Sequence, residues 1–427
     1  MALTEARSLL LVNCGQLLTL RGPRRPRTGK EMAELGLIRN GALLIRDRIV
    51  AMVGPGDRVS KSQEARGAIR LDARGNVVLP GFVDSHTHAL FAAPRVEDYV
   101  ARIQGASYAQ IARAGGGIRA SARRVRSASE RVLADHLKKV IGLFLEYGTT
   151  TVEVKSGYGL ELVQEVKMLR AIRAAASPGA VELVPTLLAH DLPVHFTHKR
   201  ARYLELVIRR LIPQVAREGL AECFDVFCDR GFFSVAEAKE LLGAAAQAGF
   251  KLKLHAEQLA RTGAARMAAG LNAISVDHLD HLTDADIRRL RGTRTIATLL
   301  PGSVLHLGSA AYPPARRLVD AGIPVALATN FNPGSSPTLN MQMILSLACS
   351  QMRMSPEEAI AAATINGAYA VGRGDRVGSL EVGKQADVVI MDVNDYREIP
   401  YFFGMNHCTT VIKKGRVVFS KAIGKGL

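Results

Sequence analysis

The stretch Pro80–Arg95 reads PGFVDSHTHALFAAPR, and the apolar run Val77–Leu79 leads into it. Side chains alternate between the two faces of an extended chain, so His86 and His88 point the same way while Thr87 points away. Two imidazoles on one face of a strand can bind a single divalent ion such as Zn²⁺ or Fe²⁺. An isolated H-x-H in a loop is usually accidental, but this pair ends a strand of buried type. The stretch therefore predicts a metal site at the end of a buried strand.

Seven further strand-like segments follow this one, and helical segments separate them. In chain order they cover residues 149–154, 182–188, 223–227, 252–254, 273–276, 295–300 and 325–328. Eight strands that alternate with helices predict an α/β protein whose parallel strands close into a (β/α)8 TIM-type barrel. A doubly wound open sheet is the competing architecture, and the number of strands favours the barrel.

The closed barrel makes a prediction that the sequence itself tests. In such barrels the functional side chains lie at the C-terminal ends of the strands. Side chains able to bind or catalyse stand at these ends, namely His86, His88, Tyr158, His190, Asp229, His255, His278 and Asn330. This agreement is the main sequence evidence for the barrel.

Both ends of the chain have a β pattern. Residues 9–12 and 17–20 are short apolar runs, and residues 42–53 form a hairpin pattern. The β pattern returns at residues 386–391 and 410–412. We therefore predict a hydrolase barrel over residues 76–375 and a smaller β-sandwich domain built from residues 1–75 and 376–427.

Composition limits the partners that we expect. Of the 427 residues 48% are apolar and 22% are charged, which is typical of a soluble globular protein. The net charge of +17 comes with only 5% aromatics and no tryptophan, so we expect a solvated basic surface and no nucleic-acid partner. No uninterrupted apolar run reaches the roughly 18 residues of a bilayer span, so we expect no membrane partner. Five scattered cysteines without a C-x-x-C pair favour a reduced, cytoplasmic setting. The oligomeric state stays open, with a homodimer as one expectation.

A third histidine completes the predicted metal site. Three neutral imidazoles from His86, His88 and His255 are typical of a catalytic site that keeps an open position for water. Water on such an ion has a pKa of about 7, which gives hydroxide at neutral pH. His255 alone would more often be a core residue, but its place at a strand end favours a ligand. For His278, general acid/base catalysis and contact with an oxyanion are equally suitable roles.

Several longer motifs resemble a known family. The segments RIQGASYAQIARAGGGI, TTVEVKSGYGLELVQEVKMLR, KLHAEQL, DHLDHL, ATLLPG, FNPGSSPTLNMQ and ATINGAYAVGRGDRVGSLEVGKQADVVIMD, together with the opening stretch, resemble the amidohydrolase superfamily. SGYGL and FNPGSSPT point within it to the imidazolonepropionase family of histidine degradation. The resemblance implies hydrolysis of the cyclic amide of 4-imidazolone-5-propanoate to N-formimidoyl-L-glutamate, with one Zn²⁺ or Fe ion per chain.

The resemblance also implies roles for single residues. The metal ligands fall on His86, His88 and His255, and the substrate contacts fall on Arg95, Tyr158, His190, Gln258, Asn332, Gly334 and Ser335. These residue types suit an imidazolone carboxylate. A carboxylate matches a guanidinium fork, and a flat polar ring matches a tyrosine and an amide side chain. The turn at residues 332–334 is expected to expose backbone N–H groups to the substrate.

One position departs from the family pattern. The eighth strand of the family ends in an aspartate that binds the metal and takes the proton of the attacking water, whereas this chain has Asn330 there. An amide can offer its oxygen to the metal, but it cannot act as a base. Proton transfer to a base typically contributes about 10²–10⁴-fold to the reaction rate. The sequence therefore predicts substrate binding with sharply reduced turnover, rescued in part by His278. A deaminase acting on another nitrogen heterocycle and a substrate-binding pseudoenzyme are the alternatives.

Overall fold

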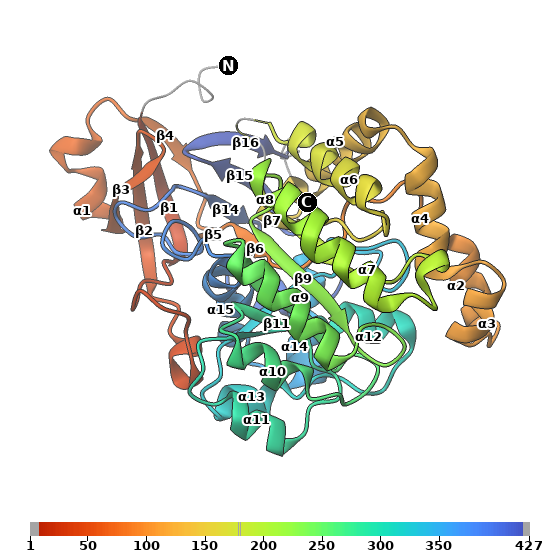
Figure 1. The fold of residues 1–427 in the computed structure, drawn as a ribbon. Coiled ribbons are helices and arrows are strands. Elements are labelled where there is room, and N and C mark those ends of the chain that lie inside the picture. The colour runs from red at the N-terminus through yellow and green to blue at the C-terminus, as the bar shows by residue number, and fades with distance from the viewer. Residues whose placement is uncertain (1–7, 178, 180, 422–427) are drawn as a thin grey trace.

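Two eight-stranded sheets organise the computed structural model, which describes residues 8–177, 179 and 181–421 (Figure 1). One sheet is parallel and forms the barrel, and the other is built from both ends of the chain. The largest hydrophobic cluster fills the space between the barrel strands and the helices outside them. This arrangement confirms the α/β class, the barrel and the separate β unit predicted from the sequence.

The barrel strands follow one another in chain order, and every neighbouring pair is parallel. They are β6 (Phe82–Asp84), β7 (Thr149–Lys155), β8 (Glu182–Ala189), β9 (Cys223–Cys228), β10 (Lys251–Ala256), β11 (Ser275–His278), β12 (Ile296–Leu299) and β13 (Val325–Leu327). The chain segments beyond β13 and β6 join through two backbone hydrogen bonds. Asn330 N–H donates to His86 C=O (3.0 Å), and His88 N–H donates to Phe331 C=O (2.9 Å). These bonds nearly close the barrel at the rim that carries the two histidines.

Helices connect the strands and cover the barrel. They are α2 (Val96–Ile103), α3 (Tyr108–Arg113), α4 (Gly117–Ser127), α5 (Glu130–Glu146), α6 (Leu162–Ala175), α7 (Arg200–Leu206), α8 (Ile212–Arg217), α9 (Val235–Gln247), α10 (Ala264–Gly270), α11 (Asp284–Leu290), α12 (Pro301–Leu307), α13 (Ala315–Asp320), α14 (Met341–Met352), α15 (Pro356–Ala361) and α16 (Gly367–Ala370). Helix α5 shows why they form. Ser129 Oγ caps its first turn by accepting the N–H of Val132 (3.3 Å), and the apolar side chains at helical spacing, such as Leu137 and Phe144, are buried.

The second sheet joins the two ends of the chain. Its order is β16 (Arg416–Ser420), β15 (Cys408–Lys413), β14 (Val388–Met391), β5 (Val77–Pro80), β1 (Ser8–Leu18), β2 (Leu37–Arg46) and β3 (Ile49–Pro55), with β4 (Ile69–Asp72) also paired to β1. Helix α1 (Gly56–Ser60) follows β3, and the short α17 (Glu398–Tyr401) precedes β15. The strands of both ends are hydrogen-bonded into one sheet, where the sequence suggested a sandwich.

Strand β5 differs from the sequence-based expectation, which placed residues 77–80 with the barrel. It pairs with β1 and β14 in the second sheet. The exchange between sheets occurs at Gly81, whose N–H donates to Asp387 C=O (3.1 Å), while the next N–H, of Phe82, donates to Gly148 C=O (3.0 Å) beside the barrel. A Cβ on Gly81 would collide with the Thr150 side chain, so only glycine fits this crossing.

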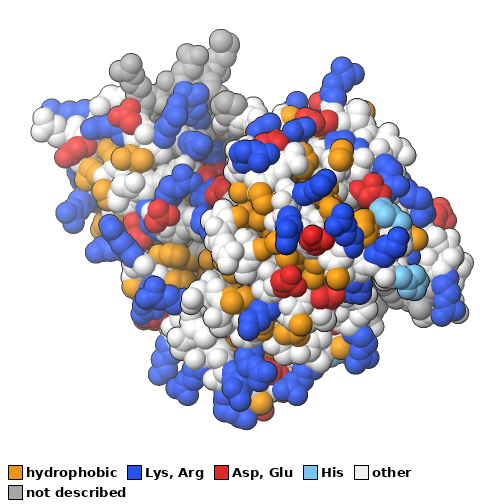
Figure 2. All heavy atoms as spheres, in the orientation of Figure 1, with side chains coloured by type: hydrophobic (Ala, Val, Ile, Leu, Met, Phe, Trp, Pro, Cys, Tyr) orange, Lys and Arg blue, Asp and Glu red, His pale blue; other side chains and the backbone are white. Residues whose placement is uncertain are grey.

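One face of the molecule shows how the charged side chains are distributed. On the face shown in Figure 2, Lys and Arg side chains are scattered over the barrel and the second sheet, with Asp and Glu among them. The helices within the described residues fall short of the length and apolar character that crossing a membrane requires.

Candidate metal centre and active site

Three histidines meet at the rim of the barrel. His86 and His88 follow β6, and His255 lies near the end of β10. Their ring centroids are 4.5 Å apart for His86 and His255, and 5.4 Å apart for each pair that includes His88. The Nε2 atoms of His88 and His255 are 3.3 Å apart. The structure thus brings together the three residues that the sequence selected as metal ligands, from two distant parts of the chain.

Two aspartates fix the direction of two of these rings. His86 Nδ1–H donates to Asp277 (2.6 Å), and His255 Nδ1–H donates to Asp225 (3.1 Å), so the Nε2 lone pair of each ring is free to bind an ion. Burial holds the pKa of His86 well below its usual range and keeps this ring neutral. His86 Nε2 is buried and has no hydrogen-bond partner among the described residues.

The donor set therefore fits a divalent ion. One ring nitrogen from each of the three histidines lies within 4.8 Å of the other two, and all three side chains are buried. Nitrogen lone pairs that converge without donors between them repel one another unless a cation lies among them. Neutral imidazoles are the usual ligands of Zn²⁺ and also suit Fe²⁺.

Asn330 lies beside this cluster, directly after β13. Its backbone has φ of 51°, in the left-handed region that asparagine and aspartate tolerate better than most residues. The side-chain Nδ2 donates to Ser303 Oγ (2.7 Å), whereas the buried Oδ1 has no hydrogen-bond partner among the described residues. The amide oxygen is thus available for the fourth ligand position that the sequence assigned to it.

His278 stands at the end of β11, close to the same cluster. Its ring centroid is 5.5 Å from that of His86 and 5.3 Å from that of His255. Burial holds the pKa of His278 well below its usual range, and its Nδ1 has no hydrogen-bond partner among the described residues. A neutral imidazole in this place can accept a proton or contact the substrate.

A pocket of about 120 Å³ opens above the histidines, and the predicted substrate contacts all line it. They are Arg95, Tyr158, His190, Gln258, Asn332, Gly334 and Ser335, together with His88, His255, His278 and Asn330. Apolar side chains form much of the remaining wall, namely Ile111, Ile118, Phe227, Phe232, Leu259 and Leu307. The sequence did not single out these apolar residues. Apart from Phe227, which lies in β9, each lies in a loop or helix whose approach to the pocket depends on the closed barrel.

Two guanidinium groups give the pocket a positive end. Arg95 is almost buried, and its Nε and Nη1 have no hydrogen-bond partner among the described residues, with Asp98 3.5 Å from Nε as an ion pair. Arg102, which the sequence analysis missed, also lines the pocket and donates to Gly334 C=O (3.3 Å). Burial and the nearby charge of Arg95 lower the pKa of Arg102. A carboxylate is the group that this pair fits.

The turn after β13 differs in one respect from the expectation. The N–H groups of Gly334 and Ser335 do not face the pocket as free donors, because Asn332 Oδ1 accepts both of them (2.8 Å each). A Cβ on Gly334 would overlap the Arg95 guanidinium, so this glycine makes room for the arginine. The turn therefore acts on the pocket through the placement of Arg95.

The loop that carries Tyr158 is held from below by Glu165. The carboxylate accepts the N–H of Gly157 (2.7 Å) and of Leu160 (2.6 Å). His190 Nδ1–H donates to Gly157 C=O (3.1 Å), and the rings of His190 and Tyr158 lie 5.4 Å apart. Tyr158 is thus fixed at the wall of the pocket rather than carried on a free loop.

Asp229 has a different position from the other residues at strand ends. Its Oδ2 accepts the N–H groups of Gln258 and Leu259 (2.8 Å each), so it orients the Gln258 backbone without lining the pocket. The sequence analysis also missed the roles of Asp225 and Asp277. The signal that could have found them is a charged residue within an otherwise apolar strand, as with Asp225 in CFDVFC and Asp277 in AISVDH.

Comparison with known proteins agrees with this geometry. The model of the amidohydrolase family matches residues 77–418. An imidazolonepropionase from Solibacter usitatus is 45% identical over 96% of this chain and 99% of its own length, and one from Geobacillus kaustophilus is 44% identical over 96% and 98%.

Solved structures with the same fold are more distant in sequence. An adenosine deaminase from Xanthomonas campestris with bound zinc superposes with a TM-score of 0.71 at 19% identity, over 96% of this chain and 93% of that one. An ochratoxinase from A. niger gives a TM-score of 0.70 at 20% identity, over 98% and 97%. The chain belongs to the amidohydrolase family and, within it, to the imidazolonepropionases.

Proposed function

We propose that this chain hydrolyses the cyclic amide of 4-imidazolone-5-propanoate to N-formimidoyl-L-glutamate in histidine degradation. The observation that carries the proposal is the convergence of three buried imidazoles beside a pocket that two guanidinium groups also line. The curated relatives that share nearly the full length of the chain bear the name imidazolonepropionase. This points to opening of a ring amide rather than to a deaminase.

His86, His88 and His255 would hold one Zn²⁺ or Fe ion, and the Oδ1 of Asn330 would be a neutral fourth ligand. When bound, such an ion supplies Lewis acidity at the floor of the pocket and activates water as a nucleophile. Asp277 and Asp225 keep the His86 and His255 rings directed toward it.

The pocket residues would orient the substrate. Arg95 binds the propanoate carboxylate, with Arg102 adding positive charge beside it. Tyr158 and His190 flank the flat ring, while Gln258 can donate to one ring atom and accept from another. Held in this way, the ring carbonyl carbon would face the histidine cluster.

In the reaction, the oxygen of water bonds to the ring carbonyl carbon, the ring C–N bond breaks, and the nitrogen leaves with a proton. The water proton must first be taken by a side chain. Asn330 cannot do this because an amide is not a base, so we propose that turnover is low and that His278 takes part of this role.

The proposal extends to the setting of the enzyme. The five cysteines are free, which supports a reducing compartment such as the cytoplasm. Exposed apolar side chains at Tyr401, Phe403 and Met405 support a homodimer, which light scattering would detect. We also propose the division into a barrel domain and one β unit from both chain ends.

The test is an assay of purified protein loaded with Zn²⁺ or Fe²⁺. We expect the imidazolone to disappear with formation of N-formimidoyl-L-glutamate, which mass spectrometry identifies, and no release of ammonia. His255→Ala serves as the control that removes metal and activity together. Ammonia release with an intact ring would assign the protein to the deaminases. Binding without turnover, in the metal-loaded chain and in Asn330→Asp alike, would assign it to substrate-binding pseudoenzymes.

A further inference from the structure

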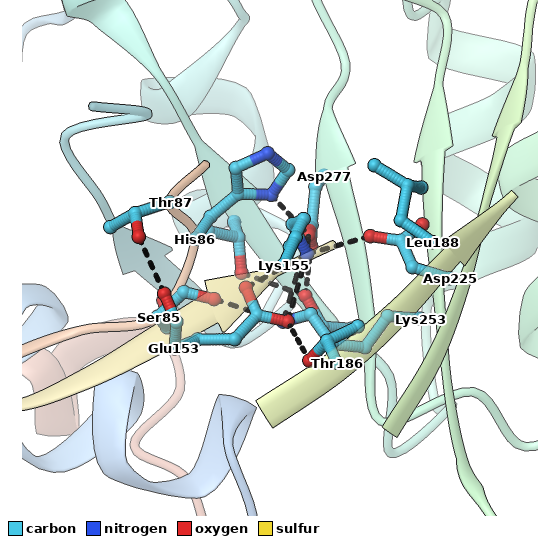
Figure 3. Close-up of polar contacts among 12 residues, drawn as sticks. Ser85, His86, Thr87, Glu153, Lys155, Thr186, Leu188, Asp225, Lys253 and Asp277 are labelled. Atoms are coloured by element: carbon cyan, nitrogen blue, oxygen red, sulfur yellow. Dashed lines mark hydrogen bonds and ion pairs between the residues drawn. The ribbon is translucent and has the colours of Figure 1, made fainter. Parts of the chain in front are cut away.

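Five charged side chains gather in the barrel interior next to His86 (Figure 3). Glu153 and Lys155 come from β7, Asp225 from β9, Lys253 from β10 and Asp277 from β11, and all five are completely buried. Burying a charge has a large desolvation cost, and a paired cluster in a core is often no more stable than apolar packing. A role other than stability is therefore expected for this group.

Lys155 is the member that links the two aspartates behind the metal ligands. Its Nζ donates to Asp225 Oδ2 (2.7 Å) and to Glu153 Oε1 (2.8 Å), and it lies 4.0 Å from Asp277 Oδ2. Asp225 uses its other oxygen, Oδ1, to accept from His255 Nδ1 (3.1 Å) and from the backbone N–H of His255 (3.2 Å). The ammonium is thus one hydrogen bond away from the group that orients His255.

The second aspartate faces the same ammonium at a longer distance, as an ion pair rather than through a hydrogen bond. Asp277 Oδ2 accepts from His86 Nδ1 (2.6 Å) and faces the Lys155 ammonium with the same oxygen. Ligand atoms of His86, Asp225 and Asp277 lie within 4.8 Å of one another, so the two carboxylates would repel without a cation near them. The surrounding carboxylates outweigh burial and raise the pKa of Lys155, which keeps its ammonium charged.

The other buried lysine of the cluster has different partners. Lys253 Nζ donates to the backbone carbonyls of Ser85 (3.0 Å) and Ala370 (3.4 Å), and it lies 3.6 Å from Asp277. Among the described residues, its ion pairs are with Asp277 and Glu153 and not with Asp225, whereas both hydrogen bonds of Lys155 go to carboxylates. Lys155 is therefore the cation that acts on both aspartates at once.

We propose that Lys155 is a positioning residue of the metal centre, whose ammonium holds Asp225 and Asp277 so that the Nε2 atoms of His255 and His86 face one ion. The inference rests on the proposed metal site. It predicts that metal affinity depends on a residue that touches neither the metal nor the substrate.

The experiment compares Lys155→Met with a matched variant, Lys413→Met. Lys413 is equally buried and pairs with Asp387 (2.7 Å), but it lies in the second sheet. We expect Lys155→Met to weaken Zn²⁺ binding by about tenfold or more in competition with a chelator, because outer partners of metal ligands typically contribute about 10–100-fold. The visible spectrum of the Co²⁺-loaded protein should also change. Lys413→Met should unfold more easily yet keep the Zn²⁺ affinity and the Co²⁺ spectrum of the unmodified chain.

A double variant separates positioning from charge balance and covers the case in which Lys155→Met does not fold. Lys155→Met with Glu153→Gln removes one positive and one negative charge, so the net charge of the cluster is unchanged. We expect it to fold and still to bind Zn²⁺ about tenfold more weakly. Zn²⁺ affinity equal to that of the unmodified chain in this double variant would overturn the inference.

A third variant keeps this failure distinct from failure of the proposed metal site. His255→Ala should lose most Zn²⁺ affinity if the site is correct. If His255→Ala loses it while the Lys155 variants keep it, only the role of Lys155 is wrong. If His255→Ala binds Zn²⁺ like the unmodified chain, the metal site itself is wrong, and the inference falls with it.

Discussion

Replacing Asn330 with aspartate puts a base next to the histidine cluster. The Oδ1 of Asn330 is buried and has no hydrogen-bond partner in the described part of the chain, and Asn330 lines the pocket together with His88 and His255. Nδ2 donates to Ser303 Oγ (2.7 Å), and a serine hydroxyl can turn to donate instead, so a carboxylate fits with the same geometry. The substitution therefore changes chemistry while leaving the shape of the pocket intact.

The expected gain follows from the step that the carboxylate supplies. Transfer of the water proton to a carboxylate base raises the reaction rate by about 10²–10⁴-fold. At about 1.36 kcal/mol for each factor of ten, this corresponds to roughly 3–5 kcal/mol of activation free energy. We expect kcat of Asn330→Asp to rise by that factor with KM almost unchanged, because Arg95, Tyr158 and Gln258 are untouched.

The assay measures kcat and KM for imidazolone hydrolysis at saturating Zn²⁺, with metal content determined on the same samples. Asn340→Asp is a matched control, since this nearly buried asparagine caps α14 by accepting the N–H of Met343 (3.2 Å), which aspartate can also do. It should leave kcat unchanged. A rise of less than about tenfold in fully metal-loaded Asn330→Asp would refute the role given to this position.

Three other substitutions test the pocket and its support. Arg95→Lys should raise KM at least about tenfold with a smaller change in kcat, because an ammonium cannot bind a carboxylate bidentately; equal KM values in steady-state kinetics would contradict this. Glu165→Gln should raise KM and lower the free energy of unfolding by about 1–3 kcal/mol, because an amide has only one oxygen for the two N–H groups beside Tyr158. An unchanged free energy of unfolding in a denaturant titration would count against this. The Arg200 hydrogen bond lowers the pKa of Glu237 from 4.5 to about 2, so stability present above about pH 4.5 should be lost as the pH falls toward about 2. In Glu237→Gln the free energy of unfolding should fall less steeply over this pH range, with a total difference of up to about 1 kcal/mol. An unchanged slope would refute the assignment.

The strand ends of the barrel could be predicted because two simple periods are visible in the sequence. Alternation places His86 and His88 on one face, and the repetition of strand and helix brings His255 and His278 to the same rim. Neither step requires knowledge of long-range contacts. The residues that line the pocket from these ends were accordingly found.

Other features depend on contacts that the sequence does not display. The transfer of residues 77–80 to the second sheet depends on pairing with β14, some 300 residues further along the chain. The N–H groups of Gly334 and Ser335 are occupied only because the Asn332 side chain folds back onto its own turn. Asp225 reaches His255 from the neighbouring strand, whereas Asp277 on β11 reaches His86, which follows β6, from a strand that is not its neighbour, so these partners follow from closure of the barrel rather than from local spacing.

A crystal structure of the Zn²⁺-loaded protein with anomalous diffraction at the zinc edge would locate the ion most directly. One anomalous peak is predicted about 2.0–2.1 Å from a ring nitrogen of each of His86, His88 and His255, with Asn330 Oδ1 facing it. A peak elsewhere in the chain, or one that contacts fewer than these three imidazoles, would contradict the metal centre and the chemistry derived from it.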